Sequence, residues 1–149
     1  MYNHLLADQV PSFWETIKFA VAKVYAIEEK DAPVIFNDIL QSMLSDKYQV
    51  FIKRSDDGKK TLQSILITEI NIHKITGFKT LRIECLYSFK YSDIKGWEDF
   101  FNFLLDFAKS QHCERIIYES NVARIWEIAE QLGFFESFRT FTYKVEGGA

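Results

Sequence analysis

The sequence has little of several residue types that mark common protein classes. Its 149 residues include only two cysteines, Cys85 and Cys113, which are too few for a disulfide framework and are expected to be small buried side chains in a reducing compartment. Two prolines and six glycines argue against linkers and low-complexity segments. No apolar run approaches the roughly 20 residues of a membrane span, and residues 1–6 lack the pattern of a secretory signal. We therefore expect one soluble, cytoplasmic domain over residues 1–149.

An excess of positive charge is also absent. Lysine and arginine total 18 against 21 aspartate and glutamate residues, so the net charge is -3 at pH 7, which argues against a nucleic-acid-binding protein. Lys59 and Lys60 belong to a local basic cluster around a turn. This cluster is either a solvated hairpin tip or a contact for an acidic partner or a nucleic-acid backbone. No spacing of cysteine, histidine and aspartate matches a zinc site, so no metal is expected.

The chain does have a strong periodic pattern of apolar residues, which make up 48% of it. The spacing predicts two helices within residues 12–45. The first begins at a capping box from Ser12 to Glu15, and the second has Pro33 in its first turn. From Tyr48 the period becomes two, which predicts an antiparallel meander of three strands over residues 48–89.

The remaining part of the chain, residues 96–146, alternates between the two periods. A strongly apolar helix, a short strand and a second helix that stops at Gly133 are followed by an aromatic, strand-like segment. The predicted order of all elements is therefore ααβββαβαβ. The predicted segments of this half are a helix over 96–111, a strand over 115–119, a helix over 122–132 and a strand over 134–145.

This order, and the local sequence from about Gln49 onward, resemble the Gcn5-related N-acetyltransferase superfamily. The stretch 125–134 (IWEIAEQLGF) is similar to the late helix that ends in Leu-Gly-Phe in that family. Residues 104–117 resemble the helix and strand that follow its cofactor loop, and residues 81–84 (LRIE) resemble divergent members often encoded in phage genomes. The resemblance implies an α+β fold with a mixed, mainly antiparallel twisted sheet flanked by helices on both faces. Other α+β architectures remain the alternative.

The resemblance also implies acetyl-CoA, held by a loop of the form Arg/Gln-x-x-Gly-x-Gly/Ala before the long helix. The glycines of such a loop let backbone amides approach the pyrophosphate at the helix N-terminus. Here the loop corresponds to residues 92–97. Ser92 stands in the Arg/Gln slot, while Lys95 and Trp97 stand in the glycine slots. Gly96 would be a displaced glycine if the alignment shifts by one residue.

Acidic residues accompany this degenerate loop. Asp93 precedes the helix, and Glu98 and Asp99 are expected in its first turn, where negative charge suits a helix but opposes a pyrophosphate. In the late helix, the slots for the Asn and the general-acid Tyr of the family fall on Val122 and Ala129, with Asn121 one position early. The candidate cofactor-binding residues are Tyr87, Ser92, Lys95, Gly96 and Asn121.

Acetyl transfer needs a base for the ammonium group of the acceptor and a surface that positions the thioester. Arg82 and Glu84 alternate on one strand. Glu119 ends the following strand, where the family's two central strands splay apart. We take Glu84, Glu119 and Arg82 as the candidate catalytic residues. The alternative is that the same side chains form a purely structural ion pair.

Two functions are therefore open. The first is an acyl-CoA-dependent N-acetyltransferase with a degenerate cofactor loop, acting on a small-molecule or protein amine. The second is a non-catalytic binding or structural protein on the same fold, phage-encoded, that serves as a virion component or contacts a host protein or itself. Binding of acetyl-CoA would distinguish the first from the second.

Overall fold

The computed structural model describes residues 2–145. Residues 1 and 146–149, which include both ends of the expected domain and the end of its predicted last half, lie outside the described residues. The chain divides into two units, residues 1–119 and residues 120–149, each described by itself. The first contains a five-stranded sheet, and the second contains one helix among its described residues. The expectation of one domain stays a prediction.

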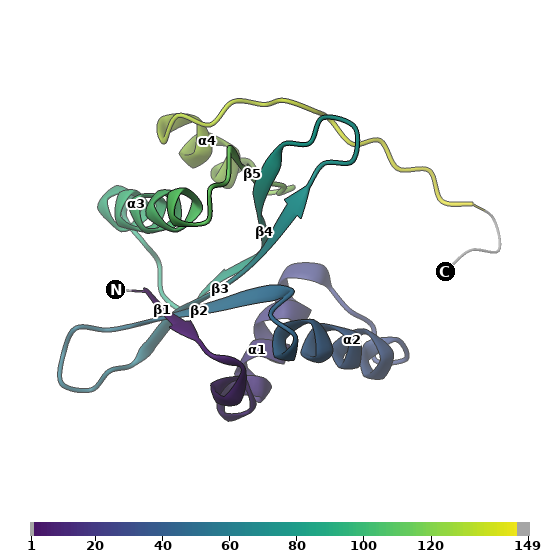
Figure 1. The fold of residues 1–149 in the computed structure, drawn as a ribbon. Helices are drawn as coiled ribbons and strands as arrows, with labels where there is room; N and C mark the ends of the chain where they lie inside the picture. Colours follow the sequence, from purple (N-terminus) through teal and green to yellow (C-terminus); the bar gives the residue numbers. More distant parts are fainter. Residues whose placement is uncertain (1, 146–149) are drawn as a thin grey trace. The chain divides into compact units, whose positions relative to one another are not determined.

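The first unit is an α+β arrangement of a mixed sheet and helices (Figure 1). The strands lie in the order β1-β2-β3-β4-β5; all neighbours are antiparallel except β4 and β5, which are parallel. In chain order the elements are β1 (Tyr2–Leu5), the 3-10 helix η1 (Ala7–Gln9), α1 (Val10–Tyr25), α2 (Ala32–Leu44), β2 (Tyr48–Arg54), β3 (Leu62–Ile72), β4 (Lys79–Ser88), α3 (Ile94–Ser110) and β5 (Arg115–Tyr118).

The predicted meander over residues 48–89 is confirmed by β2, β3 and β4, but the predicted order ααβββαβαβ is wrong at its beginning. A strand of four residues, β1, precedes α1 and pairs antiparallel with β2. Its register places Leu5 opposite Val50, both of them buried. So short a segment has too few residues to display a period, and its pairing with β2 makes it a strand.

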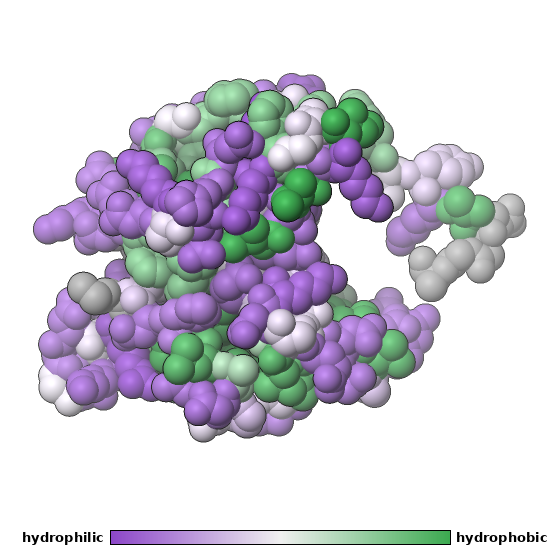
Figure 2. Space-filling model, in the orientation of Figure 1, coloured by the Kyte–Doolittle hydropathy of each residue, from purple (hydrophilic) through white to green (hydrophobic). Residues whose placement is uncertain are grey.

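The central strands are covered on both faces, as the sequence predicts. Side chains that point to alternate sides of β2 and β3 enter two separate cores. Val50, Ile52, Ile65 and Ile67 pack with α1 and α2 on one face. On the other face Phe51, Leu66 and Leu81 pack against Phe100, Leu104 and Ala108 of α3. Figure 2 shows hydrophilic side chains over much of the visible surface, with hydrophobic ones in smaller groups.

The start of α1 differs from the predicted capping box. The helix begins at Val10 and its N-cap is Gln9, so Ser12 lies inside the first turn. Pro11 explains the earlier start. The amides of the first helical turn have no partner within the helix, so a proline there costs no hydrogen bond, and its fixed φ is that of a helix. The second helix has Pro33 in its first turn, as predicted.

The second unit contains α4 (Ala123–Gln131). Gly133 has a φ of 96°, and its amide donates to the Glu130 carbonyl at 3.0 Å while the Phe134 amide donates to that of Ala129 at 2.9 Å. This is a Schellman motif, and it confirms Gly133 as the stop residue. The predicted strand over 134–145 is wrong: this described segment contains neither helix nor strand, because a period of two makes a strand only when a partner supplies hydrogen bonds.

Candidate functional site

A β-bulge at Glu84 shapes the centre of the first unit. In the register of β3 and β4, Thr68 is opposite Ile83 and Ile67 is opposite Cys85, so Glu84 is the extra residue. A bulge reverses the face on which the following side chains lie. Ile83 therefore packs on the α3 face, whereas Cys85 packs with α1 and α2. Regular alternation along a strand would place both on one face.

The bulge is held by the last residue of α1. The Tyr25 hydroxyl donates a hydrogen bond to the backbone carbonyl of Glu84. Burial raises the pKa of Tyr25 to about 12, with a further contribution from the negative charge of Glu84. The hydroxyl therefore stays protonated and remains a donor throughout the neutral range.

A pocket of about 530 Å³ lies beside this bulge, between the end of α1, α2 and strands β2 to β4. Its wall combines aromatic, apolar and acidic groups. The acidic residues are Glu28, Asp31 and Glu84, and Tyr25 and Tyr48 line the same space. A pocket that combines carboxylates with phenol rings favours a cationic ligand, because both the charges and the ring faces attract a cation.

Glu84 is the carboxylate in this pocket with a perturbed acidity. Its side chain is only 19% exposed. Burial raises the pKa of Glu84, and a hydrogen bond with the Glu69 side chain and the charges of Glu69 and Glu119 add to the rise. Arg82 acts in the opposite direction and is outweighed. A carboxylate with a raised pKa is a stronger base than an ordinary surface glutamate.

The three residues predicted to be catalytic lie in one network. Arg82 Nε is 3.1 Å from Glu84 Oε1, and Arg82 Nη2 is 2.8 Å from Glu119 Oε1. Burial alone would lower the pKa of Arg82, but the hydrogen bond to Glu119 and the two carboxylate charges raise it overall. The ion pair considered as an alternative is therefore present. It does not exclude a chemical role for Glu84, which also faces the pocket.

The edge of β4 opens next to the same residue. Pairing with β5 ends at Ile83 and Tyr118, although β4 continues to Ser88. Because β5 ends at Tyr118, it offers no strand partner to residues 84–88 of β4. An extended ligand could lie against such an edge.

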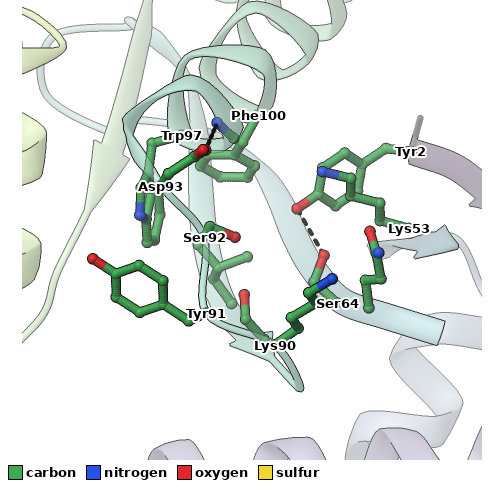
Figure 3. Close-up of a pocket in the computed structure, with 13 residues that line it drawn as sticks. Tyr2, Lys53, Ser64, Lys90, Tyr91, Ser92, Asp93, Trp97 and Phe100 are labelled. Atoms are coloured by element: carbon green, nitrogen blue, oxygen red, sulfur yellow. Dashed lines mark hydrogen bonds between the residues drawn. The ribbon is translucent and has the colours of Figure 1, made fainter. Parts of the chain in front are cut away.

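A second pocket, of about 350 Å³, lies at the loop between β4 and α3, where the family resemblance places the cofactor (Figure 3). Ser92, Asp93 and Gly96 line it, as do Lys53 and Lys90. Tyr2 Oη and Ser64 Oγ are hydrogen bonded at 2.8 Å on its opposite wall. The predicted residues Ser92 and Gly96 are thus brought together here.

The N-terminus of α3 is closed by its own N-cap. Asp93 Oδ1 accepts a hydrogen bond from the Gly96 amide at 2.9 Å. Because α3 begins at Ile94, Glu98 and Asp99 fall in its second turn, and their predicted place in the first turn is wrong. A Cβ added to Gly96 would be 3.3 Å from Ser92 Cβ, so the loop packs closely on this glycine.

These residues do not fit a pyrophosphate at the helix end. A helix N-terminus favours an anion by about 0.3–1 kcal/mol in exposed positions. A carboxylate about 4 Å away opposes it by between about 1 kcal/mol in water and about 4 kcal/mol at an effective dielectric constant of about 20. The repulsion therefore at least cancels the attraction of the helix end itself, and Lys53 and Lys90 are the cations that line this pocket. The Asp93 carboxylate also already takes the hydrogen bond of the Gly96 amide.

The other candidate cofactor residues are dispersed. Tyr87 packs edge-to-face on Phe19 of α1, with ring centroids 5.8 Å apart, and so lies on the face opposite to α3. Lys95 is exposed on the first turn of α3, outside the loop pocket. Asn121 lies in the second unit, just before α4.

Tyr25, Tyr48 and Glu69 are not among the site residues that the sequence predicts. Tyr48 faces Glu69 across β2 and β3. Burial and the charges of Glu84 and Glu69 raise the pKa of Tyr48. A signal existed for Tyr48 and Glu69, because both are polar side chains within the predicted strands. No local pattern connects Tyr25 with Glu84, which are 59 residues apart.

Cys85 is buried, and burial raises the pKa of its thiol to about 12, which agrees with a structural role. Cys113 is only partly buried. Within residues 2–145, no group of three or more His, Cys, Asp or Glu side chains could hold a metal ion. None of the helices described is long and apolar enough to span a membrane.

Comparison with solved structures shows what this arrangement is similar to. A probable acetyltransferase superposes with a TM-score of 0.74 at 9% identity, covering 98% of both chains. A predicted acetyltransferase from Clostridium acetobutylicum, solved with acetyl-CoA, gives a TM-score of 0.71 at 12% identity and covers 97% of this chain and 95% of its own. The aminoglycoside N-acetyltransferase AAC(6')-Iy, solved with CoA, gives 0.69 at 14% identity, covering 98% and 94%.

Neither a protein-family model nor a curated protein sequence matches the chain. At identities of 9–14% the likeness establishes the architecture and not the activity. The expected fold is therefore confirmed: the chain has the fold of the Gcn5-related N-acetyltransferases.

Proposed function

We propose that this protein transfers an acetyl group from a thioester of the coenzyme A class to a cationic amine. The observation that carries the proposal is Glu84, a partly buried carboxylate with a raised pKa that lines an acidic pocket beside the part of β4 that β5 does not pair. The shared fold supports it, because the similar structures include acetyltransferases solved with CoA and acetyl-CoA. The cytoplasm, where acyl thioesters are made, is the expected location.

The acceptor amine enters the pocket beside Glu84. Glu28 and Asp31 provide negative charge at the pocket wall, and Tyr25 and Tyr48 provide ring faces. An amine is a cation at neutral pH, so this wall attracts its ammonium group. Amines with a second positive charge are favoured further, since the pocket holds more than one carboxylate.

Glu84 then takes one proton from the ammonium group. The neutral nitrogen attacks the thioester carbonyl carbon, a C–N bond forms, and the C–S bond breaks. The thiolate leaves with the bonding electron pair and accepts the second proton lost by the nitrogen, so the products are an amide, a free thiol and one proton passed from Glu84 to solvent. Arg82 positions the Glu84 carboxylate through their 3.1 Å contact, and Glu119 in turn orients Arg82.

The test is a screen of amine acceptors with acetyl-CoA as the donor. Polyamines, aminoglycosides, lysine and peptides with a free N-terminus are incubated with the protein, and thiol release and acetylated product are measured together. Glu84→Gln is the matched control, because it keeps the size of the side chain and removes its basicity. The proposal fails if no acceptor gives thiol release above that of Glu84→Gln at millimolar donor.

A second candidate is a non-catalytic binding protein on the same fold. The segment 134–145 favours it, because five large apolar side chains there are at least 74% exposed. Exposed aromatic residues anchor protein interfaces. The partner would be a second copy of the chain, a virion protein or a host protein, as the phage resemblance implies. The exposed residues are Phe135, Phe138, Phe141, Tyr143 and Val145.

Replacing two of these rings separates the two candidates. Phe141→Ser combined with Tyr143→Ser removes aromatic surface that is 90% exposed at both positions, so the first unit is unaffected. A binding protein should lose self-association or partner capture, as measured by sedimentation and pull-down. An acetyltransferase should keep its turnover in the double variant.

A further inference from the structure

The loop before α3 carries its own negative group where an anionic ligand would have to bind. Asp93 is the N-cap of the helix, and its carboxylate accepts the Gly96 amide hydrogen bond at 2.9 Å. Its backbone carbonyl also accepts a hydrogen bond, from the Trp97 amide at 3.1 Å. These two hydrogen bonds, of which Figure 3 shows the one to the carboxylate, are both made within the first turn of the helix.

A separate observation concerns space. The ideal Cβ position of Gly96 is 3.3 Å from Ser92 Cβ and 3.5 Å from Asp93 Oδ1. The one glycine of the loop is thus used for close packing of the loop on itself. The positions on either side hold Lys95, which lies outside the pocket, and Trp97, whose side chain lines it where a glycine would leave the backbone open.

We infer that Asp93 substitutes for the ligand pyrophosphate at α3, so that the protein recognises a thioester donor by its pantetheine arm and not by its nucleotide. This inference rests on the proposed acetyl transfer for the identity of the donor. The pantetheine arm is uncharged and extended, and the β4 edge beyond Ile83 offers it backbone groups without the need for a cation. The donors accepted would then include thioesters that lack the nucleotide.

The test compares three probes by calorimetry: CoA, pantetheine and ADP, which carries only the pyrophosphate and nucleoside. We expect the wild-type protein to bind CoA and pantetheine with affinities within roughly threefold of each other and ADP not at all. Activity assays provide the parallel readout, with kcat/KM for acetyl-CoA and S-acetylpantetheine differing by a similarly small factor. A preference of 100-fold or more for CoA over pantetheine would overturn the inference.

Two substitutions distinguish the effect of the Asp93 charge from the effect of its hydrogen bond with the Gly96 amide. Asp93→Asn removes the charge and keeps an N-cap of similar strength, so the helix is preserved. Asp93→Gly removes both at a cost of a few tenths of a kcal/mol in a typical helix, because glycine is an acceptable N-cap. Asp99→Asn is the control, since it removes one charge from the second turn of the same helix and leaves the Gly96 amide engaged.

Removal of the Asp93 carboxylate should raise the affinity for ADP and for CoA by roughly tenfold or more, and the increase should be largest in Asp93→Gly. The affinity for pantetheine should not change. Asp99→Asn should change the three affinities by less than roughly twofold. Unchanged ADP affinity in both Asp93 variants would refute the inference, even if no probe binds the wild type. The proposed function fails on a different result, namely the absence of acetylated product with every donor and amine.

Discussion

Replacement of Glu84 by glutamine is the most direct perturbation of the proposed chemistry. Glutamine has the same shape and still accepts a hydrogen bond from Arg82, whose Nε is 3.1 Å from Glu84 Oε1. It cannot take a proton. A positioned general base contributes about 10²- to 10⁴-fold to a rate. We expect kcat/KM for the amine to fall by about 10²-fold at pH 8, which corresponds to about 2.7 kcal/mol of transition-state stabilisation.

The pH dependence gives the decisive signature. Burial and the neighbouring Glu69 raise the pKa of Glu84 above its ordinary value of 4.5. Because the carboxylate is the active form, kcat/KM of the wild type should increase with pH through this raised pKa and then level off. Glu84→Gln should lack that limb of the profile. The assay is thiol release at saturating donor over the pH range in which the fold is stable.

Stability should respond in the opposite direction to pH. The folded state binds the Glu84 proton more tightly than the unfolded state, so the free energy of unfolding declines as pH rises from 4.5 through the raised pKa, and is level above it. The glutamine variant should lose this decline. Glu98→Gln is the control, because it removes one exposed carboxylate from α3 and leaves the contacts of Arg82 with Glu84 and Glu119 in place. A Glu84→Gln variant that loses less than about threefold in rate and keeps the acidic limb would refute the reasoning.

Three further predictions address the scaffold. Leu104→Ala, at a fully buried position of α3, should lower the free energy of unfolding by about 3–5 kcal/mol in urea titrations, because it leaves a cavity in the core. His112 follows α3 with a φ of 58°, in the left-handed region. His112→Gly should raise the free energy of unfolding by about 0.5–1 kcal/mol, because glycine removes the steric strain of that conformation and this gain exceeds the conformational entropy that glycine loses on folding. Tyr25→Phe should remove one phenol that ionises near pH 12 from the ultraviolet titration, together with the hydrogen bond to the Glu84 carbonyl.

Much of the fold is predictable because its main signals are local. The change of period at Tyr48, the proline in α2 and the glycine after α4 each act within one turn or one strand. The sequence patterns identify four strands, β2 to β5, and four helices to within a few residues. The segment 134–145 shows the limit of this approach. Its aromatic alternation resembles a strand, but a strand exists only through hydrogen bonds to a partner, and alternation does not supply one.

The orientation of the candidate site could not be predicted in the same way. Leu81, Ile83 and Cys85 alternate with polar residues, which predicts one apolar face along the whole strand. The extra residue at Glu84 breaks that face, and it exists because β3 pairs with β4 in two registers, before and after Ile67. The residue that stabilises the bulge, Tyr25, comes from a helix 59 positions earlier. Such a contact depends on tertiary packing.

The two halves of the candidate site consequently depend on different parts of the first unit. Glu84 is oriented by the bulge, by Tyr25 of α1 and by Arg82 within its own strand. The anion position depends on the loop and first turn of α3, and Asp93 occupies it. If the protein transfers acetyl groups as proposed, the absence of glycine from positions 95 and 97 weakens only the interaction with the nucleotide of the donor, and Glu84 and its pocket are unaffected. Such an enzyme should have a reduced affinity for its donor and keep the capacity to deprotonate a bound amine.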